Sequence, residues 1–256
     1  MSQARQRLTV EQEPFLAVRS FACGYSSRHL IAPHQHDWHQ LLYACAGAMT
    51  VHAERSSWMI PPGKAVFIPA GCSHSIRMWG NVAMRSLAFP ATLDVAAPAS
   101  GECRVLSVTP LLRELILRII AMSALDSRIP AHHRLLSVLL DEMNAAAVAP
   151  LVLPLPLDVR ALAVAEHVLA SPSDSETLDA LARRYGAGRR TLERLFRNET
   201  GMSFGLWRQK ARMLDSVRLL SEGQSVTDAA LDTGYSSVSA FIAAFKHTFG
   251  CTPGRL

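Results

Sequence analysis

The stretch Glu176-Thr-Leu-Asp-Ala-Leu-Ala-Arg-Arg-Tyr-Gly-Ala-Gly-Arg-Arg-Thr-Leu-Glu-Arg-Leu-Phe-Arg197 decides the fold of the C-terminal half. Its first part predicts a short helix, because Thr177 is a favourable N-cap and the apolar residues behind it recur at helical spacing. The glycines of Tyr185-Gly-Ala-Gly188 indicate a turn, since glycine readily adopts positive φ. A second helix is expected to begin at Arg189 and to bury three apolar side chains, those of Leu192, Leu195 and Phe196.

The outer face of this second helix is basic. Arg190, Glu193, Arg194 and Arg197 follow one another at the i, i+3, i+4, i+7 spacing of one helix face. Arginine is the side chain best suited to phosphates and guanine edges. A helix, a glycine turn and a basic second helix are typical of a unit that enters the major groove of DNA. A merely solvated helix face is the alternative interpretation.

A related pattern recurs about fifty residues further on. Ser225-Val-Thr-Asp228 predicts a capped helix start, and Thr233-Gly234 predicts a turn. Ser236 is expected to cap the next helix, which buries the stripe of Phe241, Phe245 and Phe249. A long helix over residues 204–220 separates the two units and is predicted to hold them at the spacing of successive grooves.

Residues 176–255 resemble the DNA-binding domain of the AraC/XylS family of bacterial regulators. The resemblance implies an all-α domain over residues 158–256, two helix-turn-helix units and binding to double-stranded promoter DNA. The matching residues are Leu178, Leu181, Ala182, Leu192, Arg194, Leu195, Phe196, Gly201, Ser203, Phe204, Arg212, Leu219, Leu220, Ala230, Gly234, Tyr235, Phe241, Phe245, Phe249, Gly250, Thr252 and Pro253.

Two departures from the family pattern affect the expected DNA contacts. Gly188 stands where the family usually has serine, and Ala243 stands where the second unit usually has arginine. We therefore expect base reading to be concentrated in the first unit and the second unit to contact phosphates. The predicted DNA-binding residues are Arg189, Arg190, Glu193, Arg194 and Arg197, followed by Ser236, Ser237, Ser239, Lys246 and His247.

The N-terminal half is predicted to be β. Short apolar or alternating stretches between residues 15 and 90 are separated by turn signals, which is typical of a small sandwich or barrel. From Thr109 and Pro110 onward the apolar period becomes helical. The chain is thus an expected α+β protein with a sensor barrel over residues 1–108, a helical pair over 109–147 and a proline-rich linker over 148–157. The wide apolar surface of the helical pair predicts that the pair is buried or forms a homodimer, and we expect a homodimer.

Two motifs of the N-terminal half resemble those of the cupin barrel. They are Pro33-His-Gln-His-Asp-Trp-His-Gln40 and the spaced set Gly63, Pro69, Gly71 and His74; Gln40 replaces a common glutamate, and Met78 replaces an asparagine. The resemblance implies that His34, His36 and His74 face one another. They would then bind Ni, Zn, Fe, Mn or Cu, with Gln40 or His39 completing the set. Sensor cupins without metal bind sugars or other effectors, and the histidines also suit the sensing of pH or an organic anion.

Composition narrows the class of protein. The net charge of +5 and the pI of about 9.2 permit a polyanionic partner. Five cysteines without a C-x-x-C pair indicate reduced thiols. No secretory signal and no membrane span is predicted, so a cytoplasmic location is expected. The sequence contains no P-loop, dinucleotide fingerprint or Ser-His-Asp set, and we expect no enzyme and no required cofactor. A cupin-type metalloenzyme with a helical appendage is the alternative.

Overall fold

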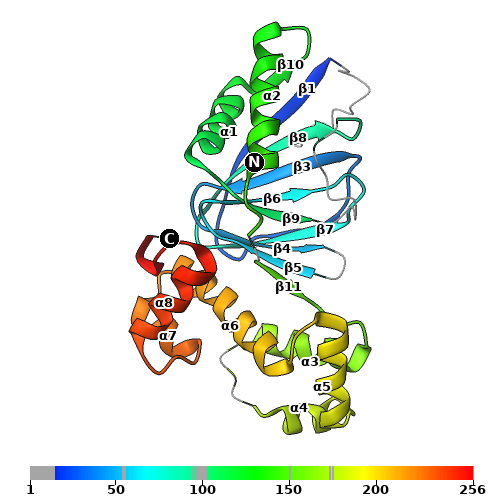
Figure 1. The fold of residues 1–256 in the computed structure, drawn as a ribbon, viewed down its shortest axis with the longest axis vertical. Coiled ribbons are helices and arrows are strands. Elements are labelled where there is room, and N and C mark those ends of the chain that lie inside the picture. Colours follow the sequence, from blue (N-terminus) through cyan, green and yellow to red (C-terminus); the bar gives the residue numbers. More distant parts are fainter. Residues whose placement is uncertain are drawn as a thin grey trace.

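The computed structural model describes residues 15–53, 56–93, 95, 103–149, 151–172, 174 and 176–255. Strands make up most of the N-terminal half and helices make up the C-terminal half, which lies below the sheets in Figure 1. The expected α+β architecture is therefore confirmed. No helix within these ranges combines the length and the apolar character needed to span a bilayer.

Two antiparallel sheets form the N-terminal domain. The first has the strand order β10-β1-β8-β3-β6-β9, and the second has the order β11-β5-β4-β7-β2. The bounds of the strands are β1 Leu16–Tyr25, β2 Leu30–His34, β3 Trp38–Ala44, β4 Ala48–Ala53, β5 Ser56–Ile60, β6 Lys64–Ile68, β7 His74–Trp79, β8 Val82–Pro90, β9 Arg104–Ser107, β10 Ala124–Asp126 and β11 Val152–Pro154.

Apolar side chains fill the space between the two sheets. Leu42, Met49, Ile60, Ile68 and Met78 are completely buried there. Each of these residues alternates along its strand with neighbours that face the opposite side, as the period of a strand requires. The interior of the cupin-like domain is thus mainly a packed core.

The predicted helical pair covers the outer side of the first sheet. It consists of α1 (Pro110–Met122) and α2 (Pro130–Ala145), and the Thr109 hydroxyl caps α1 by accepting a 3.1 Å hydrogen bond from the Leu112 amide. The inner faces of both helices pack on the sheet (Figure 1), which accounts for much of their apolar surface. Leu111 and Val138 remain 50% and 43% exposed. The homodimer through this pair stays a prediction.

Part of the proline-rich segment belongs to a sheet. Val148 forms an isolated bridge with Leu106, and β11 pairs antiparallel with β5 at the edge of the second sheet. Proline is tolerated at an edge because one side of the strand needs no amide donor. The predicted linker therefore adds a strand to the N-terminal domain before the helical domain begins.

In the part of the chain that the structure describes, six α-helices and a short 3-10 helix (Pro253–Arg255) follow this strand. Ser237, rather than the predicted Ser236, caps the last α-helix, because its hydroxyl accepts a 3.2 Å hydrogen bond from the Ala240 amide. The caps predicted at Thr177 and Ser225 are confirmed. The bounds are α3 Val159–Ala170, α4 Leu178–Arg184, α5 Arg189–Thr200, α6 Phe204–Ser221, α7 Val226–Asp232 and α8 Val238–Phe249.

The C-terminal end of α6 contacts the turn between β7 and β8. A Cβ atom added to Gly80 would overlap with the carbonyl oxygen of Ser221, and the φ of Gly80 is +67°. Beside this contact, Arg28 pairs with Glu222 at 3.2 Å, and the Arg218 guanidinium lies 5.5 Å from the Trp79 ring. Glycine at this turn thus permits the close approach of the two domains.

Gly80→Ala is expected to lower the free energy of unfolding more than Gly63→Ala does. Both glycines have positive φ, so each alanine costs about 1–2 kcal/mol of backbone strain. Only at Gly80 does the added methyl group also meet another backbone, and relieving that overlap costs about 1–3 kcal/mol more. Urea unfolding of the two variants measures the difference. An equal decrease in the free energy of unfolding for the two variants would show that α6 does not pack closely against this turn.

Candidate nucleic-acid interface and metal site

The second helix of the first helix-turn-helix unit, α5, has the predicted two faces. Leu192, Leu195 and Phe196 are buried, whereas the arginines of the opposite face are exposed. Gly188 occupies the N-cap position without a side-chain hydrogen bond, as expected from the missing serine. Gly186 has a φ of +64°, which confirms the glycine turn between α4 and α5.

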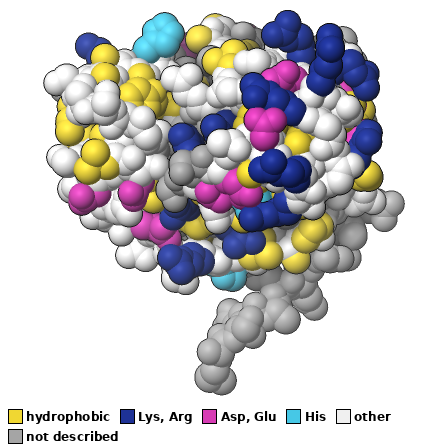
Figure 2. All heavy atoms as spheres, turned by 90° about the horizontal axis from the view of Figure 1, so that it is seen from below, with side chains coloured by type: hydrophobic (Ala, Val, Ile, Leu, Met, Phe, Trp, Pro, Cys, Tyr) yellow, Lys and Arg dark blue, Asp and Glu magenta, His cyan; other side chains and the backbone are white. Residues whose placement is uncertain are grey.

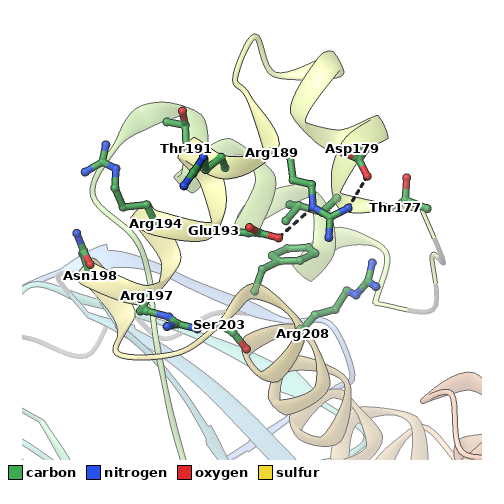
Figure 3. Close-up of a pocket in the computed structure, with 14 residues that line it drawn as sticks. Thr177, Asp179, Arg189, Thr191, Glu193, Arg194, Arg197, Asn198, Ser203 and Arg208 are labelled. Carbon is green, nitrogen blue, oxygen red and sulfur yellow. Dashed lines mark hydrogen bonds and ion pairs between the residues drawn. The ribbon is translucent and has the colours of Figure 1, made fainter.

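A surface groove of about 1070 Å³ runs along α5, and α4 and the start of α6 form its other walls. Sequence reasoning placed only residues of α5 in this interface. The groove also contains further polar residues of α5 itself and of the starts of α4 and α6, and Figure 3 shows them around the arginines of α5. These additional residues are Thr177, Asp179, Thr191, Asn198, Ser203 and Arg208.

Arg189 is held by two carboxylates within the unit. Its Nη1 lies 2.9 Å from Asp179 on α4, and its Nε lies 3.0 Å from Glu193 one turn later (Figure 3). The guanidinium thus joins the two helices of the unit and fixes Glu193. In the described part of the chain, Arg190, Arg194 and Arg197 form no ion pair, so their charges face solvent.

The linking helix α6 connects the two units through Arg212. The Arg212 guanidinium donates to the carbonyl oxygens of Pro172 and Asp174, both at 2.7 Å. Its Nη1 also lies 3.0 Å from where a Cβ of Gly234 would stand, in the turn of the second unit. One side chain therefore contacts the loop before α4 and the turn before α8, which supports a fixed spacing of the units.

The second unit presents small polar groups instead of arginines. Ser236, Ser239, Lys246 and His247 are exposed, and the hydroxyl of Ser237 is used as the helix cap. Figure 2 views the molecule from the side of the helical domain and shows more Lys and Arg side chains on the right of this face than on the left, where a few others lie. The basic surface is thus uneven, as the sequence predicted.

The three predicted metal-binding histidines come together in the sensor domain. His34 at the end of β2 pairs with His74 at the start of β7, and His36 lies in the connection to β3. Their ring centroids are 4.3 to 6.1 Å apart, and one nitrogen from each ring lies within 4.8 Å of the others. Distances of this size allow all three imidazoles to share one cation.

Main-chain carbonyls orient all three rings. The Nδ1 atoms of His34, His36 and His74 lie 2.9, 2.7 and 3.0 Å from the carbonyl oxygens of Ala32, Trp38 and Cys72. A carbonyl only accepts hydrogen bonds, so each Nδ1 is the donor and each Nε2 is the ring nitrogen left for a metal ion. In metal-binding histidines, the ring nitrogen that does not bind the metal typically donates a hydrogen bond in this way.

Two further observations fit a bound cation. His74 Nε2 is buried and has no hydrogen-bond partner among the described residues, and burial lowers the pKa of His74 to about 4, which keeps the ring neutral. Gln40 Oε1 lies 3.0 Å from His36 Nε2, while its amide nitrogen donates to Ser86 at 2.8 Å. The ring nitrogen and the amide oxygen are thus close enough to share a hydrogen bond or to bind one cation together. Gln40 is thus placed as a fourth donor.

His39 is turned away from this cluster. Its Nδ1 accepts a 3.0 Å hydrogen bond from the Ala70 amide, and the centroid of its ring lies 5.5 Å from that of the Phe67 ring. Because side chains alternate along β3, His39 and Gln40 lie on opposite faces of the strand. Of the two candidates predicted to complete the set, the structure brings only Gln40 to the histidines.

Comparison with known proteins agrees with both halves of the chain. Residues 20–139 match the family model of the AraC-like ligand binding domain, and residues 181–256 match that of a helix-turn-helix domain. The transcriptional regulator NimR of Escherichia coli K12 is 34% identical over 240 residues, which cover 93% of this chain and 87% of NimR. The chain belongs to the AraC family of transcriptional regulators. It is a DNA-binding regulator with an N-terminal ligand-binding domain, and the resemblance noted in the sequence is confirmed.

Other members of the AraC family match mainly in the helical half. The regulator RipA of Corynebacterium glutamicum is 35% identical over 100 residues, covering 39% of this chain and 30% of RipA. Among solved structures, the DNA-binding domain of AdpA in complex with a target DNA is 29% identical. That match covers 38% of this chain and 87% of the AdpA domain, with a TM-score of 0.34.

Proposed function

We propose that this regulator recognises promoter DNA mainly through α5. The exposed guanidinium groups of Arg190, Arg194 and Arg197 line one groove and form no ion pair among the described residues, and this observation carries the proposal. Arginine donates two hydrogen bonds to the O6 and N7 atoms of guanine in the major groove. Arg189 acts as a positioning residue, since Asp179 and Glu193 already bind it.

The second unit contacts the DNA backbone in this proposal. The hydroxyls of Ser236, Ser237 and Ser239 and the amine of Lys246 suit phosphate oxygens, which carry no sequence information. Ala243 is exposed on the same helix and has no hydrogen-bonding side chain for a base edge. Base reading therefore belongs to the first unit.

Arg194→Ala is expected to weaken binding to the cognate promoter by about 1–3 kcal/mol, since one bidentate base contact is lost. Arg118→Ala is a matched control, because Arg118 is an exposed arginine of α1, on the sensor domain. Fluorescence anisotropy with the gene's own upstream DNA and a scrambled duplex, at one fixed salt concentration, measures the effect. An equal loss on both duplexes would make Arg194 a phosphate contact.

We further propose that the sensor domain binds one divalent metal ion. The Nε2 atoms of His34, His36 and His74 and the Oε1 atom of Gln40 would hold it. Imidazole donors suit Zn, Cu, Fe and Ni, and Mn is a weaker match. The buried, unpartnered Nε2 of His74 supports this site. When bound, the metal supplies a cationic cross-link between β2, β3 and β7.

Strand β7 gives the proposed site a route to the DNA-binding domain. The strand starts at His74 and ends at Trp79, whose ring faces Arg218 of α6, and Gly80 follows in contact with Ser221. A shift of the strand at its histidine end would therefore change the contact with α6. We propose that the effector alters promoter affinity through this contact in the cytoplasm.

Metal analysis combined with DNA binding distinguishes this function from a cupin-type metalloenzyme. Stoichiometric metal in the purified protein and a promoter affinity that changes with chelator would support the metal-dependent regulator. Specific DNA binding with an affinity that does not change when chelator is added would indicate that the sensor domain binds an organic effector instead of a metal ion. Failure to bind its promoter specifically under all conditions would favour the enzyme, against the regulators found among the relatives.

A further inference from the structure

A cavity separates the second sheet from the helical domain. It has a volume of about 700 Å³, within the range of roughly 300–1,000 Å³ common for small-molecule sites. Strands β4, β5, β7 and β11 form one wall, and helices α3 and α6 form the other. A ligand in this cavity would touch both domains at once.

The wall on the sheet is rich in hydrogen-bond donors. His52 of β4 stands opposite Ser57 of β5, and Thr50 stands opposite Arg77 of β7. Because strand residues alternate, these four side chains share the outer face of the sheet. Among the described residues, the ring nitrogens of His52 and the guanidinium of Arg77 have no hydrogen-bond or ion-pair partner. Burial and the nearby Arg77 lower the pKa of His52, so its ring is neutral and keeps one N–H donor.

The remaining arginines of the cavity are neutralised within the protein. Arg218 binds Asp215 at 2.5 Å and Glu222 at 2.7 Å, and Arg28 also pairs with Glu222. Arg77 therefore supplies a positive charge on the sheet side that no carboxylate among the described residues pairs with; its side chain is exposed, and its guanidinium lies 5.9 Å from the centroid of the Trp79 ring. Glu166 lines the opposite wall on α3, where it disfavours an anion.

Apolar side chains form the rest of the cavity. Leu153 of β11 and Leu214 of α6 are buried, and Leu169 of α3 and Leu155 are half-buried beside them. The indole of Trp79 lies at the same boundary. A site with a few convergent polar groups and a largely apolar lining is typical of small organic ligands.

We infer that this cavity binds a small organic anion with an apolar body. Its carboxylate or sulfonate group would contact Arg77, His52 and Ser57, and its apolar part would cover Leu169 and Leu214. The inference rests on the regulator function proposed above and assigns it a second effector site, separate from the histidine cluster. Because the ligand bridges both domains, its binding stabilises their docked arrangement.

Titration with 1-anilinonaphthalene-8-sulfonate tests the site, because this dye combines a sulfonate with an apolar body. The wild-type protein is expected to show one saturable site with a fluorescence increase. Arg77→Ala should weaken that binding at least about tenfold, the effect of losing a charged hydrogen bond. Arg118→Ala removes an exposed arginine from α1 and should bind the dye as the wild type does. Equal binding by both variants, or no saturable site, would overturn the inference.

Competition defines the chemical class of the ligand. We expect 4-phenylbutyrate to displace the dye and 4-phenylbutanol, of similar size and uncharged, to displace it at least about tenfold less well. Equal displacement by the two compounds would overturn the anion site. Arg77→Lys, which keeps the charge, should retain more affinity than Arg77→Ala. Metal content and promoter binding are measured on the same samples. A result that rules out ligand binding in the cavity can therefore be distinguished from one that rules out the proposed regulator function.

Discussion

His74→Ala is expected to lower the affinity of the sensor domain for Zn²⁺ or Ni²⁺ at least about 100-fold. Removing a residue that merely hydrogen-bonds to a metal ligand already lowers metal affinity about 10–100-fold, so removing the ligand itself should cost at least as much. His74 is 1% exposed, and its Nδ1 is bound to the Cys72 carbonyl, so its Nε2 is oriented before any metal arrives. Neighbouring side chains cannot replace a buried ligand of this kind. Isothermal titration and metal analysis of the purified variant measure the loss.

His39→Ala is the matched control for this experiment. His39 lies close in sequence to the cluster but contacts Phe67 on the other face of β3. Its replacement should leave metal stoichiometry unchanged. If the His39 variant loses metal as the His74 variant does, or if the His74 variant retains it, the proposed donor set is wrong.

Trp207→Ala is expected to lower the free energy of unfolding by about 3–5 kcal/mol. The Trp207 ring is completely buried and lies 5.2 Å from the Phe196 ring in an edge-on arrangement. Its Nε1 donates a 2.7 Å hydrogen bond to the Pro154 carbonyl of β11, so it also ties α6 to the sensor domain. The substitution removes both the packing and this link, and urea unfolding followed by far-UV circular dichroism measures the cost.

Trp207→Phe separates the two contributions. Phenylalanine keeps most of the ring packing but leaves the Pro154 carbonyl without its donor, which costs about 1–3 kcal/mol. The phenylalanine variant should therefore unfold at a urea concentration between those of the wild type and the alanine variant. Equal losses in both variants would mean that ring packing contributes little here.

The sequence predicted those parts of the DNA interface that depend on near neighbours. The caps at Thr177 and Ser225, the turn at Gly186 and the two faces of α5 follow from residues at most a few positions apart. The cap of α8 was misplaced by one residue, because Ser236 and Ser237 are adjacent and only the backbone geometry selects Ser237. The binding of Arg189 by Asp179 of α4 was not predictable, since it needs the packing of two helices.

In the sensor domain, too, the sequence predicted the features that depend on residues close together along the chain. The sequence by itself determined the α+β class, the family and the choice of His34, His36 and His74, because apolar periodicity, helix caps and motif spacing can be recognised from neighbouring residues. Only the tertiary structure decided that Gln40 and not His39 faces the histidines, and that Val152–Pro154 completes a sheet edge. It alone also placed Arg77 opposite α3 and α6, because contacts between distant residues depend on how whole elements pack, which no local pattern encodes.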